Sequence, residues 1–268
     1  MTIPANVRTR PASTPVAESI TRVSTRSDDV EIRFGLPEDR GDWLLCSDLL
    51  EDPQLFTRWR KTLGAWLVDE YGESSDRATA GYVMGWYLGV AGGLAGLLFH
   101  SARRVPSLKP TDLAFRIAND DRPHVAGIAL LSDDFACLPD DPSGNHPAAT
   151  VVADEQALAA VLRARYTAHA AAFVGAYAPT VRLGRRMLWA AATDALDKGA
   201  WLAGRMCGDE ATGVADAAML LPERLEPLTS ASTLRMVDGE WTRKRESCCF
   251  TYVLPGAEAC DTCPRICH

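Results

Sequence analysis

Apolar residues recur at helical spacing in the segment that follows Glu51. Five of them stand at i, i+4, i+8, i+11 and i+12, which is the one-sided stripe of an amphipathic helix. They are Leu55, Trp59, Leu63, Trp66 and Leu67. We therefore expect a helix within residues 51–71.

Three later segments repeat this helical pattern. They cover residues 154–178, 180–206 and 209–222. A proline suits the first turn of a helix, where its missing N–H would have no partner. We therefore expect the second of these helices to begin near Pro179.

The most apolar part of the chain lies between Arg77 and Arg103, where no charged residue occurs. The segment is long enough to span a bilayer, and Gly85, Gly89 and Gly93 would give it a face for close helix packing. It is also rich in Gly and Ala and carries a histidine near one end. No other segment of the sequence is as long and apolar, and the rest has the pattern of a globular protein. We therefore expect a central buried helix without stable membrane insertion.

Two short apolar runs, Leu113 to Ala118 and Val125 to Leu131, flank the turn-rich stretch NDDRPH. This arrangement predicts a β-hairpin near residues 112–131. The fold class we expect is α+β and mainly α.

The pattern of apolar and polar residues divides the chain into three parts. Residues 1–29 mix Pro, Thr, Ser and Arg, and we expect a disordered or weakly ordered tail there. Residues 30–240 form the mainly helical body. Residues 241–268 form a loop-rich segment that carries most of the cysteines.

Composition and missing motifs disfavour several kinds of function for this protein. The net charge of −7 disfavours binding to nucleic acid. The first residues lack the apolar run of a signal peptide, so we expect a cytoplasmic protein. No G-x-G-x-x-G follows a predicted strand, and G-x-S-x-G and H-E-x-x-H do not occur, so the sequence shows no dinucleotide-binding or hydrolase signature.

Cysteine is the residue type that points to chemistry. Cys46, Cys137 and Cys207 stand alone in apolar surroundings and are typical of core residues. The last 22 residues, SCCFTYVLPGAEACDTCPRICH, hold five of the eight cysteines. In a reducing compartment, clustered thiols are more often metal ligands than disulfides. Two thiolate pairs suit either one tetrahedral zinc ion or the two irons of a 2Fe–2S cluster, and spacing alone leaves both open.

The pattern C-C-x10-C-x2-C is more specific. Together with the lead-in CCFTYVLPG, the preceding Arg245 and the following Pro264, it resembles the C-terminal 2Fe–2S motif of the FhuF-type ferric-siderophore reductases. The resemblance covers about the last 25 residues of the chain. It implies that the chain binds a 2Fe–2S cluster. The ligands that it implies are Cys248, Cys249, Cys260 and Cys263.

The chain departs from this pattern after Pro264. Cys267 and His268 add further donors, and Cys267 is an alternative to Cys248 as the fourth ligand. An adjacent pair such as Cys248 and Cys249 needs a turn or bulge before both sulfurs can point to one cluster. We favour Cys248, because the whole family spacing then matches.

The resemblance implies one-electron reduction of siderophore-bound Fe³⁺, with release of Fe²⁺. The implied partners are a ferric siderophore, for which a hydroxamate type fits, and an electron donor such as a ferredoxin, a flavodoxin or a reductase. Arg243, Lys244 and Arg245 are candidates for tuning the cluster or for docking a partner. Two alternatives remain at this point: a non-catalytic module with a structural four-thiolate zinc site, and an iron–sulfur electron-transfer protein for another partner.

Overall fold

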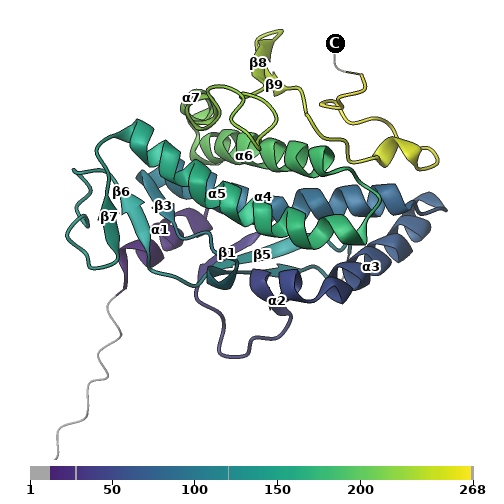
Figure 1. The fold of residues 1–268 in the computed structure, drawn as a ribbon, viewed down its shortest axis with the longest axis horizontal. Coiled ribbons are helices and arrows are strands. Elements are labelled where there is room, and N and C mark those ends of the chain that lie inside the picture. The colour runs from purple at the N-terminus through teal and green to yellow at the C-terminus, as the bar shows by residue number, and fades with distance from the viewer. Residues whose placement is uncertain (1–12, 28, 120, 267–268) are drawn as a thin grey trace, which may run out of the picture.

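The computed structural model describes residues 13–27, 29–119 and 121–266. Helices form most of this part of the chain, and the strands are short (Figure 1). The helices are α1 (Pro15–Ser24), α2 (Cys46–Glu51), α3 (Pro53–Tyr71), α4 (Asp76–Ala102), α5 (Glu155–Tyr177), α6 (Arg185–Cys207) and α7 (Glu210–Leu220). The strands are β1 (Glu31–Phe34), β2 (Trp43–Leu45), β3 (Arg104–Pro106), β4 (Leu113–Ile117), β5 (Val125–Leu130), β6 (Phe135–Cys137), β7 (Ala149–Val151), β8 (Leu234–Val237) and β9 (Glu240–Arg243). The expected α+β class, mainly α, is confirmed.

The helix that the apolar stripe predicts is α3, and local signals fix both of its ends. Asp52 caps its first turn by accepting a hydrogen bond from the Gln54 amide, and Pro53 occupies the first helical position. Gly72 ends the helix in the left-handed conformation, with φ of 76°. The stripe faces inward, where Phe56, Trp59, Leu63 and Leu67 are buried.

Helix α4 is the central element of the body. Figure 1 shows α6 along one side of it and the strands β1 and β5 on the other. The α4 and α6 backbones touch, because a Cβ atom built on Gly96 would lie 2.5 Å from the carbonyl carbon of Gly199. In the described residues, α4 alone is long and apolar enough to span a membrane, and 72% of its most apolar window is buried by the rest of the fold. The expectation of a central buried helix is confirmed.

The sheets are small and lie around the helical centre. The expected β-hairpin is confirmed as the antiparallel pair β4 and β5, within a four-stranded sheet of order β1-β5-β4-β2. A second sheet has the order β3-β6-β7. A third, two-stranded sheet pairs β8 with β9.

The structure corrects three expectations. Within the predicted tail, Pro15–Ser24 forms the helix α1, which buries Val16, Ile20 and Val23; these lie at i, i+4 and i+7 and form a short apolar stripe. Helix α6 begins at Arg185, because Pro179 lies in a separate 3-10 turn. The predicted loop-rich segment from residue 241 begins within a strand, because β9 (Glu240–Arg243) pairs with β8 there. Residues 1–12 of the predicted tail lie outside the described residues.

Candidate metal centre

The cysteine-rich segment lies across α6 and α4, and a buried carboxylate on α6 holds it in place. Asp194 accepts hydrogen bonds from the backbone amides of Glu246 at 2.9 Å and Ser247 at 2.8 Å, and from the Ser247 hydroxyl. Its side chain is only 7% exposed. Because these two amides directly precede Cys248, Asp194 fixes the point at which the cysteine motif begins.

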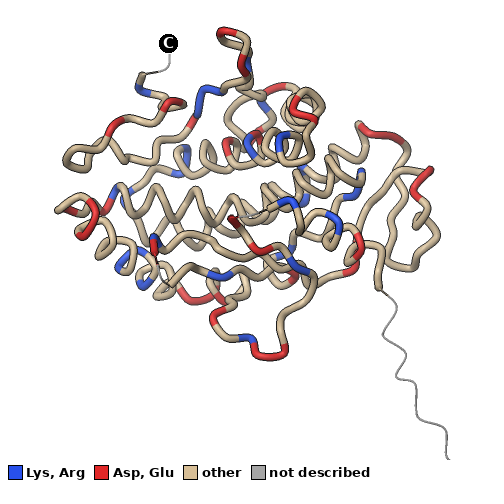
Figure 2. Tube along the Cα trace, turned by 180° about the vertical axis from the view of Figure 1, so that it is seen from behind, with Lys and Arg blue, Asp and Glu red and all other residues tan. Residues whose placement is uncertain are grey.

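Two arginines of the same segment neutralise Asp194. Arg243 lies 3.6 Å from the carboxylate and donates to the Asp194 carbonyl at 2.9 Å. Arg245 lies 3.9 Å from the carboxylate. A buried carboxylate needs such partners, because desolvation otherwise disfavours its charge. Figure 2 shows the corresponding stretch of basic residues on the chain that leads from the β8–β9 hairpin into the C-terminal segment.

Helix α4 supplies a flat surface for the first cysteine pair. A Cβ atom on Gly81 would lie 2.7 Å from the Cys249 carbonyl oxygen, so only glycine permits this close approach. On the next residue of the helix, the Tyr82 hydroxyl lies 2.9 Å from the Thr251 hydroxyl. The motif is therefore fixed to both central helices.

The adjacent pair Cys248 and Cys249 stands at a sharp turn of the backbone. Phe250 has φ of 61°, in the left-handed region, and a 3-10 helix follows at Thr251–Val253. The Phe250 amide donates to the Cys248 sulfur at 3.3 Å, and the Thr251 hydroxyl lies 3.1 Å from the Cys249 sulfur. This is the kind of turn that an adjacent pair needs in order to serve one cluster.

Two backbone hydrogen bonds hold the second pair beside the first. The Cys263 amide donates to the Cys260 carbonyl at 2.8 Å, which closes the C-x-x-C turn. The Arg245 amide donates to the Thr262 carbonyl at 3.2 Å. This second bond joins the chain before the first pair to the chain within the second pair.

The four thiols interact electrostatically around a ring. Cys249 interacts with Cys248 and Cys260, and Cys263 interacts with the same two. Cys248 and Cys263 are buried, at 6% and 2% exposure, whereas Cys249 and Cys260 are partly exposed. Among the described residues, no three His, Cys, Asp or Glu side chains are grouped closely enough to hold a single metal ion.

Arg245 is a cation in direct contact with these thiols. Its guanidinium donates to the Cys260 sulfur at 3.8 Å, and it also interacts with Cys249 and Cys248. Burial raises the pKa of Cys249, but hydrogen bonds from Thr251 and the Arg245 charge outweigh burial, so the pKa falls below its usual value. Burial and the neighbouring Cys249 raise the pKa of Cys260. Cys249 is therefore the first of this pair to become a thiolate.

The partly exposed thiols face a cavity of about 380 Å³. Cys249, Cys260 and Thr251 form one wall, and Gly81, Tyr82 and Trp86 of α4 form another. The cations in the lining are Arg243 and Arg245 of the segment and Lys198 of α6. The exposed side of the thiol set thus opens into a space with basic residues around it.

Residues 245–265 match a known family of domains, whose description is the FhuF 2Fe-2S C-terminal domain. This match covers 21 of the 268 residues of the chain. The matched stretch includes Arg245 and all of Cys248, Cys249, Cys260 and Cys263. The cofactor is therefore a 2Fe–2S cluster, as the family resemblance implied. No curated protein is a significant match to the chain.

The residues of the matched stretch suit a 2Fe–2S cluster. Such clusters are held by four thiolates and tuned by hydrogen bonds to sulfur. Here Phe250, Thr251 and Arg245 each place an N–H or O–H group within hydrogen-bonding distance of one of three thiols. The assignment of the four individual ligands stays a prediction, and Cys267 and His268 lie outside the described residues.

The structure also shows site residues that the sequence did not reveal. Asp194, Tyr82 and Lys198 come from helices more than 40 residues before the motif. The only signal for Asp194 was a carboxylate on the apolar face of a predicted helix. Of the three basic candidates, Arg243 and Arg245 line the cavity and contact Asp194, and Lys244 does not line it.

Proposed function

We propose that the protein is a ferric-siderophore reductase, which passes one electron to siderophore-bound Fe³⁺ and releases Fe²⁺. The FhuF domain supports an iron–sulfur redox protein of siderophore metabolism. The observation that carries the finer proposal is the cavity of about 380 Å³ that reaches Cys249 and Cys260. An electron acceptor in this cavity would lie directly beside the cluster ligands.

The chemistry needs no general acid, base or nucleophile. Hard oxygen donors hold Fe³⁺ tightly and Fe²⁺ much less tightly, so one electron is enough to loosen the ion. When bound, the 2Fe–2S cluster supplies a single low-potential electron. The protein has to position the chelate near the cluster and let it leave again.

Different residues of the cavity hold the motif in place, tune the cluster and attract the chelate. Arg243 and Arg245 keep Asp194 neutralised and so hold the motif against α6. Arg245 also places its N–H group and positive charge beside Cys260, which raises the potential of a thiolate-bound cluster. Lys198 offers a further cation to the oxygen donors of a chelate.

We propose the same partners and location for this function as the sequence suggests. A ferric siderophore of hydroxamate type is the substrate, and a ferredoxin, a flavodoxin or a reductase is the electron donor. The protein acts in the cytoplasm, where a reducing environment keeps its thiols available.

The test combines metal analysis with iron release. Protein purified without oxygen is expected to be red-brown, to contain two irons per chain, and to release Fe²⁺ from a ferric trihydroxamate in the presence of dithionite and an Fe²⁺-trapping dye. A colourless protein with one zinc ion would support the structural zinc alternative. A coloured protein that releases no Fe²⁺ above the dithionite control would support electron transfer to another partner.

A further inference from the structure

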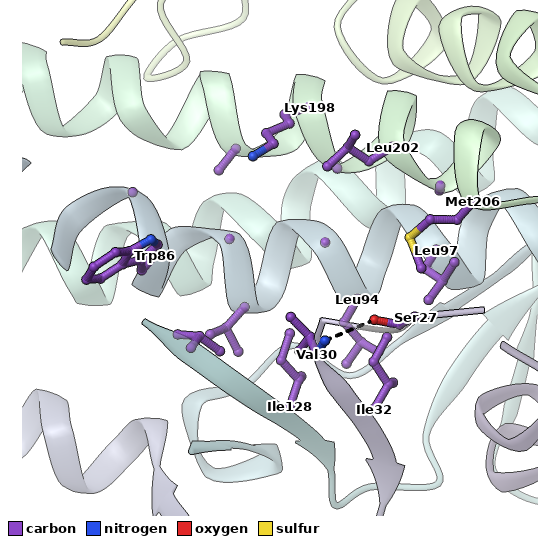
Figure 3. Close-up of a pocket in the computed structure, with 18 residues that line it drawn as sticks. Ser27, Val30, Ile32, Trp86, Leu94, Leu97, Ile128, Lys198, Leu202 and Met206 are labelled. Atoms are coloured by element: carbon purple, nitrogen blue, oxygen red, sulfur yellow. Dashed lines mark hydrogen bonds between the residues drawn. The ribbon is translucent and has the colours of Figure 1, made fainter. Parts of the chain in front are cut away.

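A second cavity, of about 290 Å³, lies between α4, α6 and the sheet. Figure 3 shows Leu94 and Leu97 of α4, Leu202 and Met206 of α6, and Ile32 and Ile128 of β1 and β5 around it. The lining is apolar over nearly its whole extent. Its volume is near the lower end of small-molecule sites and suits one chain of a ligand better than a whole chelate.

Glycines keep this cavity open. A Cβ atom on Gly85, Gly89 or Gly93 would meet no atom within 4 Å. By contrast, Gly92 on the adjoining face of α4 is needed for packing, because its Cβ atom would lie 2.9 Å from the Ala195 carbonyl oxygen. Glycine destabilises a helix relative to alanine. The three open glycines therefore weaken α4 without any packing requirement in the described residues.

The apolar cavity adjoins the cavity at the cluster. Gly85, Trp86, Ala195 and Lys198 line both. In Figure 3 the Lys198 side chain points from α6 into the space between the helices, on the Trp86 side of the apolar lining. The two adjoining spaces thus give one elongated groove, with the thiols at one end and mostly apolar groups at the other.

Lys198 gives the groove a charge at the junction. Burial, together with the charges of Arg243 and Arg245, lowers its pKa. Arg243 and Arg245 are paired with Asp194, whereas Lys198 has no hydrogen bond or ion pair within the part of the chain that the structure describes. An electron-rich group of a ligand would therefore be attracted to this point.

We infer that the apolar part of the groove binds an alkyl or acyl arm of the ferric chelate, while the iron-bearing head lies in the cavity at the cluster. The substrate class is thus an amphiphilic ferric siderophore. This inference rests on the proposed function. It is argued from the shared lining of the two adjoining cavities, the open glycines and the position of Lys198 between an apolar and a polar end.

The test compares two chelates that differ only in the arm. A linear trihydroxamate with a single free amine is acylated with either an acetyl or an octanoyl group and loaded with Ga³⁺. Ga³⁺ has the charge of Fe³⁺ but accepts no electron under these conditions, so calorimetric titration measures binding alone. The octanoyl chelate is expected to bind at least about tenfold more tightly than the acetyl chelate, because several methylene groups become buried.

Matched variants locate this preference. Gly89→Leu places a side chain in the open space and is expected to abolish the preference for the octanoyl arm; Gly93→Leu repeats the test one turn further along α4. Gly175→Leu is the control, because Gly175 is also helical and has open space at its Cβ position, but lies on α5 outside the groove. Circular dichroism confirms that each variant is folded.

The outcomes separate this inference from the proposed function. Equal affinity of the wild-type protein for the two chelates, or a preference that survives in folded Gly89→Leu and Gly93→Leu, would overturn the inference. The same chelates loaded with Fe³⁺ test reduction separately. An octanoyl preference without Fe²⁺ release would support the groove and contradict the reductase function.

Discussion

At the scale of single residues, the four family cysteines differ in their surroundings. Cys248 and Cys263 are buried, whereas Cys249 and Cys260 line a cavity. Each of the four interacts electrostatically with two others. The exposed pair lies where an electron could leave the cluster, and the buried pair lies where the protein shields it.

Replacement of a predicted ligand is expected to remove the cluster. Cys260→Ser should lose most of its iron and its visible absorption, because serine oxygen is a poor substitute for thiolate sulfur at an iron–sulfur cluster. Cys207→Ser, which changes a half-buried cysteine at the end of α6, is the control and should keep both. Iron content and the visible spectrum are the measurements.

The fourth ligand is tested in the same way. The Cys248 thiol interacts with Cys249 and Cys263 and accepts a hydrogen bond from the Phe250 amide. We therefore expect Cys248→Ser to lose the cluster and Cys267→Ser to retain it. The opposite pattern would assign the ligand set to Cys249, Cys260, Cys263 and Cys267.

A histidine in the core predicts a pH dependence of stability. His169 is 1% exposed, its ring stacks on Tyr87, and its Nδ1 atom lies 2.8 Å from the Leu108 carbonyl. Burial lowers its pKa to about 4 from an ordinary value of 6.5. The unfolded chain therefore binds a proton more readily, and the free energy of unfolding should fall by roughly 3 kcal/mol as the pH drops from about 6.5 to about 4.

Urea unfolding between pH 7 and pH 4.5 measures this dependence. His169→Leu should be less stable at pH 7 but should show a weaker loss of stability over this interval. His146→Gln is the control, because His146 is partly exposed. A loss that is equally steep in His169→Leu would assign the pH dependence to other groups.

At the scale of elements, α6 holds the cysteine segment through one carboxylate. Asp194→Asn removes the charge that Arg243 and Arg245 share, and leaves two cations close together. Loss of one partner from a buried ion pair costs about 3–5 kcal/mol. Solvent at the partly exposed Arg245 lowers this cost. We expect an overall loss of about 3 kcal/mol in urea unfolding and faster loss of the cluster in air.

The matched control for this change is Asp140→Asn, at an exposed position in the loop after β6. It removes the same charge and should alter neither stability nor cluster lifetime measurably. Equal behaviour of the two variants would show that Asp194 does not anchor the segment.

The two glycine faces of α4 give a second prediction at this scale. Gly96→Ala should destabilise the protein by about 1–3 kcal/mol, because the new methyl group would lie 2.5 Å from the Gly199 carbonyl carbon. Gly93→Ala should stabilise it by about 0.5–1 kcal/mol, because the methyl group enters open space and alanine favours the helix. Thermal or urea unfolding of the two variants measures both changes in stability. A loss of stability in both would contradict the open space that Gly93 faces in the groove.

Local patterns predicted some elements well and others poorly. The stripe of α3 and the two runs of β4 and β5 were readable because each sequence period matches one buried face. The helix α1 was missed because its apolar residues stand among Pro, Thr, Ser and Arg, and only tertiary packing buries them. The start of α6 was misplaced because Pro179 can begin a 3-10 turn as well as an α-helix.

At the scale of the whole molecule, the sequence predicted the cluster but not its setting. The cysteine pattern is local, and the stretch that contains it, residues 245–265, matches the FhuF 2Fe-2S C-terminal domain. Asp194, Lys198 and Trp86 join the site only because α4 and α6 lie side by side, which no short sequence pattern contains. The absence of stable membrane insertion and the cytoplasmic location stay predictions, although the fold buries most of the apolar window of α4.

The most direct test of the account is a single-turnover experiment without oxygen. Protein reduced at its cluster and freed of excess reductant is mixed rapidly with a ferric trihydroxamate and an Fe²⁺-trapping dye. We predict that the cluster absorption returns to its oxidised form as Fe²⁺ appears, with one Fe²⁺ per oxidised cluster, because a 2Fe–2S cluster passes one electron at a time. A cluster that stays reduced, or becomes oxidised without any Fe²⁺, would contradict the proposed reductase.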